Sequence, residues 1–432
     1  MGASSVRIAD LPGAVGAEVE IRGWVEGLRK SGGIRFALLR DGTGRVQAVV
    51  REQDVAGATW ERSAVLVQET AVVVRGRCRA DARAPSGVEL DVADLEIVGA
   101  SGEYPIQPKE HGVDFLLDHR HLWVRSARQA AILRVRSRFE HALRSWLDEQ
   151  GFIAADTPIL TPSACEGTTT LFETTYFEQK AYLSQSGQLY NEALALALGK
   201  VYCFGPAFRA ERSKTRRHLI EFWMVEPEMA FTDLDGCLET VEGMLSAAVG
   251  DVAERCAEDL RTLGRDPAEL AKVRAPFPRI SYDDALGILR EEGFDLPWGE
   301  DFGAPHEAAI SQRFELPVFV HRYPKAAKAF YMKPDPERPE VVLSADLLAP
   351  QGYGEIVGGG QRIDDYDLLL ERLHEHDLPV EDYNWYLDLR RYGSVPHSGF
   401  GLGIERTLAW MLGLEHVREA IPFPRMLYRL RP

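Results

Sequence analysis

The sequence predicts an α+β protein of more than one domain, with a small β-barrel followed by a larger mixed domain. The chain has 432 residues, which is long for a single hydrophobic core. The first hundred residues contain short β-like segments separated by turn residues. The remainder combines amphipathic helical stretches with apolar β runs. The predicted domain bounds are 1–102 for the barrel, 103–125 for a linker or hinge and 126–432 for the second domain.

Five strands are expected in the barrel, punctuated by Gly, Asp and Ser. A helical patch at 54–66 lies between the third and fourth of them. Five strands with one short helix fit the OB-fold. The expected strands are 17–29, 33–41, 44–51, 69–80 and 88–99.

The second domain should begin with a long amphipathic helix that ends near Gly151, followed by a short strand running into Pro158. Two apolar β runs then flank a charged stretch, which predicts a hairpin with a long loop. Near the end, a glycine-rich strand passes into a helix that starts near Ile404. Together these elements predict an antiparallel sheet flanked by helices, with further helices at 232–262, 281–292 and 363–376.

Composition narrows the class of protein. No apolar stretch reaches membrane-spanning length, and the first residues lack a signal-peptide core. The five cysteines form no CxxC pair, which argues against a zinc site or a disulfide framework and favours a reducing, cytoplasmic location. The formal charge is −16. A nucleic-acid partner would therefore have to be held by local basic patches.

The most concentrated basic patch is FRAERSKTRRH at 208–218, with four arginines, a lysine and a histidine. Arg209 and Glu211 are two residues apart, so on a strand they would share one face. Such concentrated positive charge suits a polyphosphate or an RNA end. A plain surface ion pair is the alternative. On the following apolar strand, Glu226 and Glu228 need a cation, a metal or a donor-rich ligand, and a purely structural network is also possible.

Two glycine-rich stretches follow. In 352–362 the glycines let backbone approach a ligand, and Glu355, with Asp346 upstream, offers hard oxygen ligands for Mg²⁺. In 399–408 the glycines precede a helix N-terminus, which favours phosphate binding, and Arg406 adds a positively charged guanidinium group. Neither a GxGxxG nor a GxxxxGK[ST] pattern is present.

Taken in order, the long helix with its strand and Pro158, the charged hairpin and GFGLGIER resemble the three signature motifs of class II aminoacyl-tRNA synthetases. With the barrel, the chain resembles the subclass of aspartyl, asparaginyl and lysyl enzymes. SQSGQLYNEALA (184–195) is similar to the asparaginyl form, since aspartyl enzymes usually have Pro at Gly187 and Lys at Asn191. LLAPQGYGEIVGGGQR (347–362) and YLDLRRYGSVPHSGFGLG (386–403) are asparaginyl-like too.

This resemblance implies an asparagine–tRNA ligase that forms an asparaginyl-adenylate from ATP, with Mg²⁺. Arg209 and Arg406 would be its catalytic residues. Glu192 and Arg362 would read the side-chain amide as acceptor and donor. The ATP-binding residues would be Arg209, Glu211, Arg217, His218, Phe222, Glu355 and Arg406, and the asparagine-binding residues Glu166, Gln188, Glu192, Arg209 and Arg362.

The resemblance also implies Glu355 and Asp346 as metal ligands. The family's usual Ser ligand is replaced by Gly358. In the barrel, Phe36 would stack on an anticodon base of tRNA(Asn) and Gln47 would read it, with Arg29 on the RNA backbone. Phe36 as ordinary barrel core is the alternative.

A homodimer is expected, with neither a membrane nor a DNA partner. The competing functions are an aspartyl-tRNA synthetase of relaxed specificity, a tRNA-independent asparagine synthetase and a non-catalytic relative.

Overall fold

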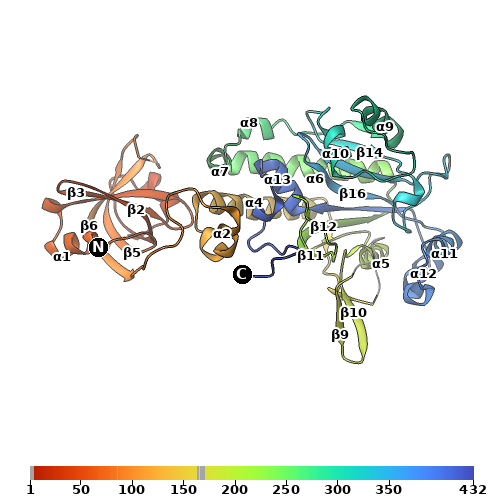
Figure 1. Cartoon of the computed structure of the whole chain (residues 1–432), viewed down its shortest axis with the longest axis horizontal. Coiled ribbons are helices and arrows are strands. Elements are labelled where there is room, and N and C mark those ends of the chain that lie inside the picture. Colours follow the sequence, from red (N-terminus) through yellow and green to blue (C-terminus); the bar gives the residue numbers. More distant parts are fainter. Residues whose placement is uncertain (1–3, 85, 163–164, 166–170) are drawn as a thin grey trace. The chain divides into compact units, whose positions relative to one another are not determined.

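A computed structural model describes residues 4–84, 86–162, 165 and 171–432 (Figure 1). The chain divides into two compact units, Met1–Leu116 and Leu117–Pro432. In the described residues no helix combines the length and apolar character needed to cross a membrane.

The first unit is a closed β-barrel. Its strand order is β1-β2-β3-β4-β6-β5, and β5 pairs back onto β2. The core is filled by inward side chains such as Ile21, Leu39 and Val74, which have no exposed surface. The five expected strands and the helix are confirmed. The elements are β1 Ser4–Ser5, β2 Glu18–Ser31, β3 Ile34–Arg40, β4 Arg45–Arg51, α1 Gly57–Ala64, β5 Ala71–Ala80 and β6 Val88–Gly99.

The second unit is built on an eight-stranded sheet of order β13-β14-β15-β16-β17-β12-β11-β7. The outermost strands β13 and β7 pair parallel to their neighbours, and all other pairs are antiparallel. The predicted antiparallel sheet is confirmed. Its strands are β7 Ile153–Ala154, β11 Lys200–Phe208, β12 Glu221–Ala230, β13 Arg279–Ser281, β14 Val318–His321, β15 Ser344–Ala349, β16 Gly354–Gln361 and β17 His397–Gly403; β8 Leu160–Thr161, β9 Glu173–Tyr176 and β10 Gln179–Leu183 form a small separate sheet.

Helices α4 and α6 cover the sheet with their apolar stripes (Figure 1). The long helix α4 begins after Ser126, whose hydroxyl accepts from the Gln129 backbone N–H at 3.3 Å. The expected helix at 232–262 is two helices, α6 and α7, because the helix is interrupted at Cys256. The helices are α2 Val113–Asp118, α3 Arg120–Trp123, α4 Ala127–Glu149, α5 Gln188–Leu198, α6 Leu234–Arg255, α7 Ala257–Thr262, α8 Pro267–Leu270, α9 Tyr282–Glu291, α10 Ala304–Ser311, α11 Tyr366–Glu375, α12 Asn384–Arg391 and α13 Ile404–Leu412.

The predicted hairpin is formed by β11 and β12, but its charged stretch is not strand. Phe208 and Glu221 are the last paired residues, and only the Arg209 N–H reaches across, to the Ile220 carbonyl at 3.0 Å. The prediction that Arg209 and Glu211 share a strand face is therefore wrong. Both residues lie in the loop that connects the two strands.

Strands β16 and β17 approach so closely that Gly359 has no room for a side chain. A Cβ there would lie 2.5 Å from the Gly399 carbonyl oxygen and 2.5 Å from Cβ of Phe400. The glycine thus permits the central pairing of the sheet.

Gly359→Ala is expected to lower the free energy of unfolding of the second unit by about 1–3 kcal/mol, because the added methyl group overpacks the sheet. Gly205→Ala in β11 is the matched control, since a Cβ there meets no atom within 4 Å. The control should stay within about 0.5 kcal/mol of the parent. Urea denaturation followed by tryptophan fluorescence measures both, and equal losses would contradict the packing argument.

Candidate active site

Two cavities of the second unit adjoin. The first lies over the ends of β12 and β17 and the start of α13, and the second lies over β12, β16 and the start of α5. Four residues line both: Arg209, Met224, Glu355 and Gly401. The cavities therefore meet at Arg209 and Glu355, and ligands in the two would meet there as well.

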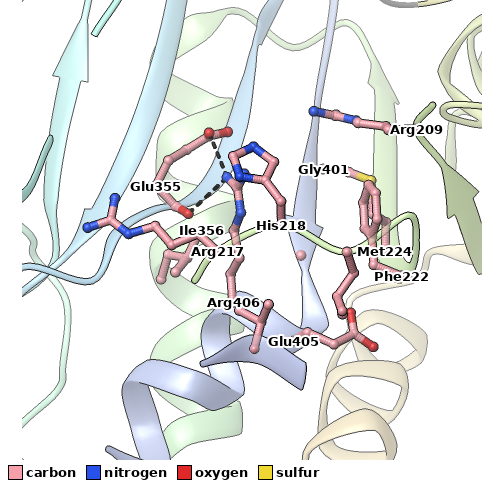
Figure 2. Close-up of a pocket in the computed structure, with 13 residues that line it drawn as sticks. Arg209, Arg217, His218, Phe222, Met224, Glu355, Ile356, Gly401, Glu405 and Arg406 are labelled. Carbon is pink, nitrogen blue, oxygen red and sulfur yellow. Dashed lines mark hydrogen bonds and ion pairs between the residues drawn. The ribbon is translucent and has the colours of Figure 1, made fainter. Parts of the chain in front are cut away.

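The first cavity is lined largely by cations and apolar surface (Figure 2). Arg406, in the first turn of α13, donates from Nη1 to Glu355 Oε2 at 2.9 Å. Arg217 donates to Glu307 at 2.9 Å and to the Gly352 carbonyl. Each guanidinium has five N–H donors, so both retain donors for a further anion. The lining residues are Arg209, Arg217, His218, Leu219, Phe222, Met224, Glu355, Ile356, Gly401, Gly403, Glu405, Arg406 and Val417.

Arg209 differs from these two arginines. Its Nε is a buried atom that has no hydrogen-bond partner in the described part of the chain. Its guanidinium carbon lies 5.4 Å from the centre of the Phe222 ring, on the opposite side of the cavity from Glu355 (Figure 2). Leaving a buried N–H unpaired costs about 1–3 kcal/mol, so this side chain is set to receive an anionic ligand.

Glu211 and His218 lie near each other in the loop, with Glu211 Oε2 4.0 Å from His218 Nε2. Burial, with the positive charge of Arg406, lowers the pKa of His218. At neutral pH this side chain is therefore an uncharged hydrogen-bonding group.

The second cavity contains a buried ion pair between β12 and the residue after β16. Arg362 donates from Nε to Glu228 Oε1 at 3.0 Å and from Nη2 to Oε2 at 2.9 Å. Each side chain is only 2% exposed. Although burial opposes it, Glu228 raises the pKa of Arg362, so the guanidinium stays charged. Among the described residues, the remaining nitrogen, Nη1, has one long contact, of 3.7 Å to Met332 Sδ.

Glu192 and Arg362 were expected to read one side-chain amide together as acceptor and donor, and that expectation stays a prediction. In the structure, Arg362 pairs with Glu228. Glu192 is fully buried. Its Oε2 accepts a hydrogen bond from Arg390 Nη2 at 2.6 Å and also lies 2.9 Å from His397 Nε2. Although burial opposes ionisation, Arg390 and His397 lower the pKa of Glu192 below its ordinary value.

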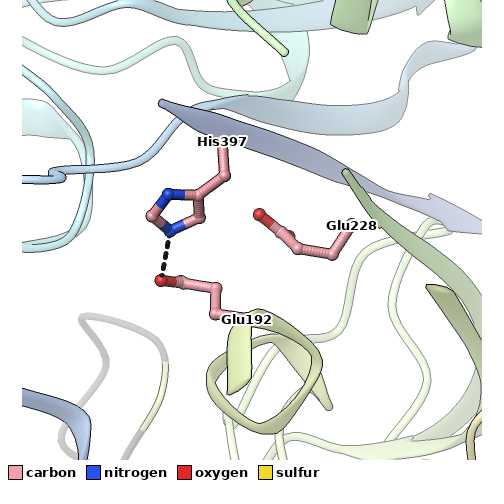
Figure 3. Close-up of side chains that lie close together, drawn as sticks. All are labelled: Glu192, Glu228 and His397. Carbon is pink, nitrogen blue, oxygen red and sulfur yellow. Dashed lines mark hydrogen bonds and ion pairs between the residues drawn. The ribbon is translucent and has the colours of Figure 1, made fainter. Parts of the chain in front are cut away.

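Glu192, Glu228 and His397 bring ligand atoms within 4.8 Å of one another, as Figure 3 shows. These are metal-ligand residue types. Arg362 nevertheless binds both carboxylate oxygens of Glu228, and Arg390 binds Glu192 in a pair with no exposed surface. The cluster is therefore an ion-pair network.

Asp346 on β15 and Glu355 on β16 face one another across Gly358. A Cβ at Gly358 would lie 3.0 Å from Glu355 Oε1 and 3.4 Å from Asp346 Oδ1. Burial, with the nearby carboxylates of Glu355 and Asp301, raises the pKa of Asp346 to about 7, although Lys328 Nζ lies 2.6 Å away. Two converging carboxylates suit a divalent cation.

Of the remaining predicted amino-acid ligands, Gln188 lines the second cavity. Glu166 lies outside the described residues. Sequence reasoning missed the site roles of Glu307 and Lys328, since neither belongs to a recognisable motif. The sequence identified Glu228 as an acidic residue on an apolar strand, but it did not identify Arg362 as the partner.

In the barrel, Phe36 is half-buried on β3, directly before the buried Ala37, and it does not belong to the core cluster. The Arg29 guanidinium lies 4.7 Å from its ring centre. Gln47 Nε2 donates to Glu89 Oε1, which leaves the Gln47 carbonyl oxygen as the end of the amide open to a ligand. The alternative that Phe36 is ordinary barrel core does not match this position.

Comparison with known proteins finds a family profile for the barrel and another for the second unit. A family profile described as tRNA synthetases class II (D, K and N) matches residues 112–427, and one described as OB-fold nucleic acid binding domain matches 19–98. The asparagine–tRNA ligases of Pelotomaculum thermopropionicum and Thermus thermophilus are 58% and 57% identical; the first match covers 99% of both chains, and the second covers 99% of this chain and 100% of that relative.

Solved structures agree with these relatives. The crystal structure of asparaginyl-tRNA synthetase from Pyrococcus horikoshii complexed with asparaginyl-adenylate matches with a TM-score of 0.96 and 46% identity, over 99% of this chain and 100% of that one. An aspartyl-tRNA synthetase from Entamoeba histolytica matches with a TM-score of 0.85 and 26% identity, over 100% of this chain and 93% of that one.

Arg362→Ala is expected to destabilise the second unit by about 3–5 kcal/mol, because it leaves the Glu228 carboxylate buried without a counter-charge. The double variant Arg362→Met/Glu228→Gln, which removes both charges, should recover most of that loss. Urea denaturation of the two variants measures the difference. If the double variant were as unstable as the single one, the unpaired Glu228 charge would not be the source of the loss.

Proposed function

The chain belongs to the class II tRNA synthetases of the D, K and N group, and from that premise we propose that it joins L-asparagine to tRNA(Asn) through an asparaginyl-adenylate. The observation that carries this proposal is the meeting of the two cavities at Arg209. ATP in the first cavity and asparagine in the second would place the α-phosphate and the amino-acid carboxylate on either side of the Arg209 guanidinium, whose Nε has no hydrogen-bond partner among the described residues.

The first step is an in-line displacement. A carboxylate oxygen of asparagine attacks the α-phosphorus of ATP, the bond from that phosphorus to the bridging oxygen breaks, and pyrophosphate leaves. Arg209 orients both anions and neutralises the charge that builds between them, so no side-chain nucleophile is needed. In the second step the 3′-terminal hydroxyl of the tRNA attacks the carbonyl carbon, and AMP leaves.

The rest of the first cavity is proposed to hold ATP. Phe222 presents a half-buried ring for the adenine, and Glu211 would accept from the adenine amine. Arg406 and Arg217 are proposed to take the outer phosphates, with His218 as a neutral donor. Their contacts to Glu355 and Glu307 hold both guanidinium groups at the cavity wall before ATP arrives.

For the asparagine side chain we revise the pair that reads the amide. Arg362 Nη1 is proposed to donate to the amide oxygen, because Nε and Nη2 of the same guanidinium already donate to Glu228. Glu228, in place of Glu192, would accept from the amide NH₂ and repel an aspartate carboxylate. No lysine takes the place of the neutral Asn191. The cavity's Lys328 is paired with Asp346.

A magnesium ion fits at Asp346 and Glu355, whose buried carboxylates converge across Gly358. Bound with ATP, Mg²⁺ would neutralise phosphate charge. Glycine adds no side-chain ligand, so these two carboxylates are the protein's proposed ligands. They also hold Lys328 and Arg406 by ion pairs.

We also propose a homodimer. Strand β7 is an edge of the main sheet, and large apolar side chains are exposed there and on the small neighbouring sheet. An uncovered edge with apolar side chains favours association. These residues are Ile153, Ile159, Leu160, Tyr176 and Phe177.

The predicted domain bounds stay a proposal, with 103–125 as the hinge. A cytoplasmic location is proposed because the five cysteines, all of them described residues, are buried and form no disulfide.

The function is tested by ATP–pyrophosphate exchange with asparagine and with aspartate. Exchange is expected with asparagine and near background with aspartate. Arg209→Ala should lower kcat by about 10²–10³, the loss typical of removing one preorganised donor. Arg255→Ala, an exposed arginine of α6, is the control and should leave exchange unchanged. Exchange driven by aspartate would make the enzyme aspartyl-specific, and absence of exchange with either amino acid would refute adenylation.

Phe36→Ala in the barrel should raise the KM for tRNA(Asn) in aminoacylation by about 5- to 100-fold, since one stacked base is worth about 1–3 kcal/mol. Exchange without tRNA should not change. Val98→Ala, which truncates an exposed apolar side chain of β6, serves as the control. Equal KM values for Phe36→Ala and the parent would remove Phe36 from the anticodon site.

A further inference from the structure

Glu192 cannot contact a ligand without breaking a contact it already has. Besides Arg390 and His397 on Oε2, its Oε1 accepts from Tyr386 Oη at 2.7 Å and from Gln188 Nε2 at 3.1 Å. A carboxylate has about four acceptor positions, and here all four are used. The side chain is 0% exposed and is not among the residues that line the second cavity.

Gln188 is the one of these four partners that lines the second cavity. It lies in the first turn of α5, one helical turn before Glu192, so that their side chains meet on one face of the helix. A glutamine amide has a donor end and an acceptor end. Because Glu192 binds the Nε2 end, Oε1 is the end that remains for a ligand.

We propose that Glu192 is a positioning residue that fixes the Gln188 amide with its carbonyl oxygen toward the second cavity. The cavity thereby presents an acceptor to an N–H donor of the bound amino acid, either its ammonium group or its side-chain amide. This inference rests on the proposed function, because asparagine is taken as the ligand. Under this proposal Glu192 does not contact the asparagine itself but acts on it through Gln188.

Glu192→Gln tests this role without changing volume. Arg390 has donors only, so the oxygen of the new amide must face Arg390. The new NH₂ then faces Gln188, which has to turn and offer its own oxygen. The turned Gln188 presents NH₂ to the cavity, and an acceptor for the ligand becomes a donor.

In ATP–pyrophosphate exchange, Glu192→Gln is expected to raise the KM for asparagine about tenfold or more, the effect of losing roughly 1.4 kcal/mol. The KM for ATP should stay unchanged. The double variant Glu192→Gln/Gln188→Glu restores an acceptor, because a glutamate at 188 accepts from the new NH₂ and still presents an oxygen. Its KM for asparagine should return to within about threefold of the wild type.

Tyr386→Phe is the matched control. It removes the other donor to Oε1 of Glu192 but leaves Gln188 oriented, so the KM for asparagine should change less than twofold. The idea is overturned if Glu192→Gln leaves that KM unchanged, if Tyr386→Phe raises it equally, or if the double variant shows no rescue.

Thermal unfolding of each variant checks the fold. Should Glu192→Gln alone fail to fold, the double variant still decides, since a tenfold rise in its KM would refute the proposal. Wild-type protein without asparagine-dependent exchange would instead refute the proposed function itself.

Discussion

The arrangement around the second cavity depends on two buried carboxylates, each of which is matched by an arginine. Glu228 and Arg362 join β12 to the end of β16, and Glu192 and Arg390 join α5 to α12. Removing such charges from water costs several kcal/mol per ion, which close geometry and further hydrogen bonds must offset. Both pairs satisfy this condition with donor–acceptor distances of 2.6–3.0 Å. Four elements around the cavity are thereby fixed in one arrangement.

Against this background, the unpaired Nε of Arg209 has a clear meaning. Arg362, Arg390 and Arg406 all have carboxylate partners. Of these three, Arg362 and Arg406 line the cavities, whereas Arg209, whose Nε has no partner among the described residues, lies where the two cavities meet. A reaction between two anionic substrates needs its compensating charge at that point, and a guanidinium held there before binding needs little reorganisation.

Periodicity and motif order predicted most of the fold. The structure confirms the elements that follow from local patterns. These are the five barrel strands, the hairpin of β11 and β12 and the start of α13 at Ile404. The end of β11 could not be derived, because it depends on where cross-strand pairing stops and not on residue type. The partner of Arg362 was also beyond local reasoning. Residues 192 and 228 are both acidic and close in space, and only the tertiary arrangement decides between them.

The glycine-rich stretches show the same limit. They were interpreted as places where backbone approaches a ligand, yet three of their glycines make room for the protein's own charges. A side chain at Gly399 would collide with Glu228, and one at Gly354 with both Arg217 and Glu307. Gly358 leaves the space between Asp346 and Glu355 open. Because Glu228 is paired with Gly399 across the sheet, its carboxylate can reach Arg362 only over a residue without a side chain. The glycines of the site therefore leave room for ion pairs as well as for close approach of the backbone. A side chain added at these positions would disturb the ion pairs before it could contact a substrate.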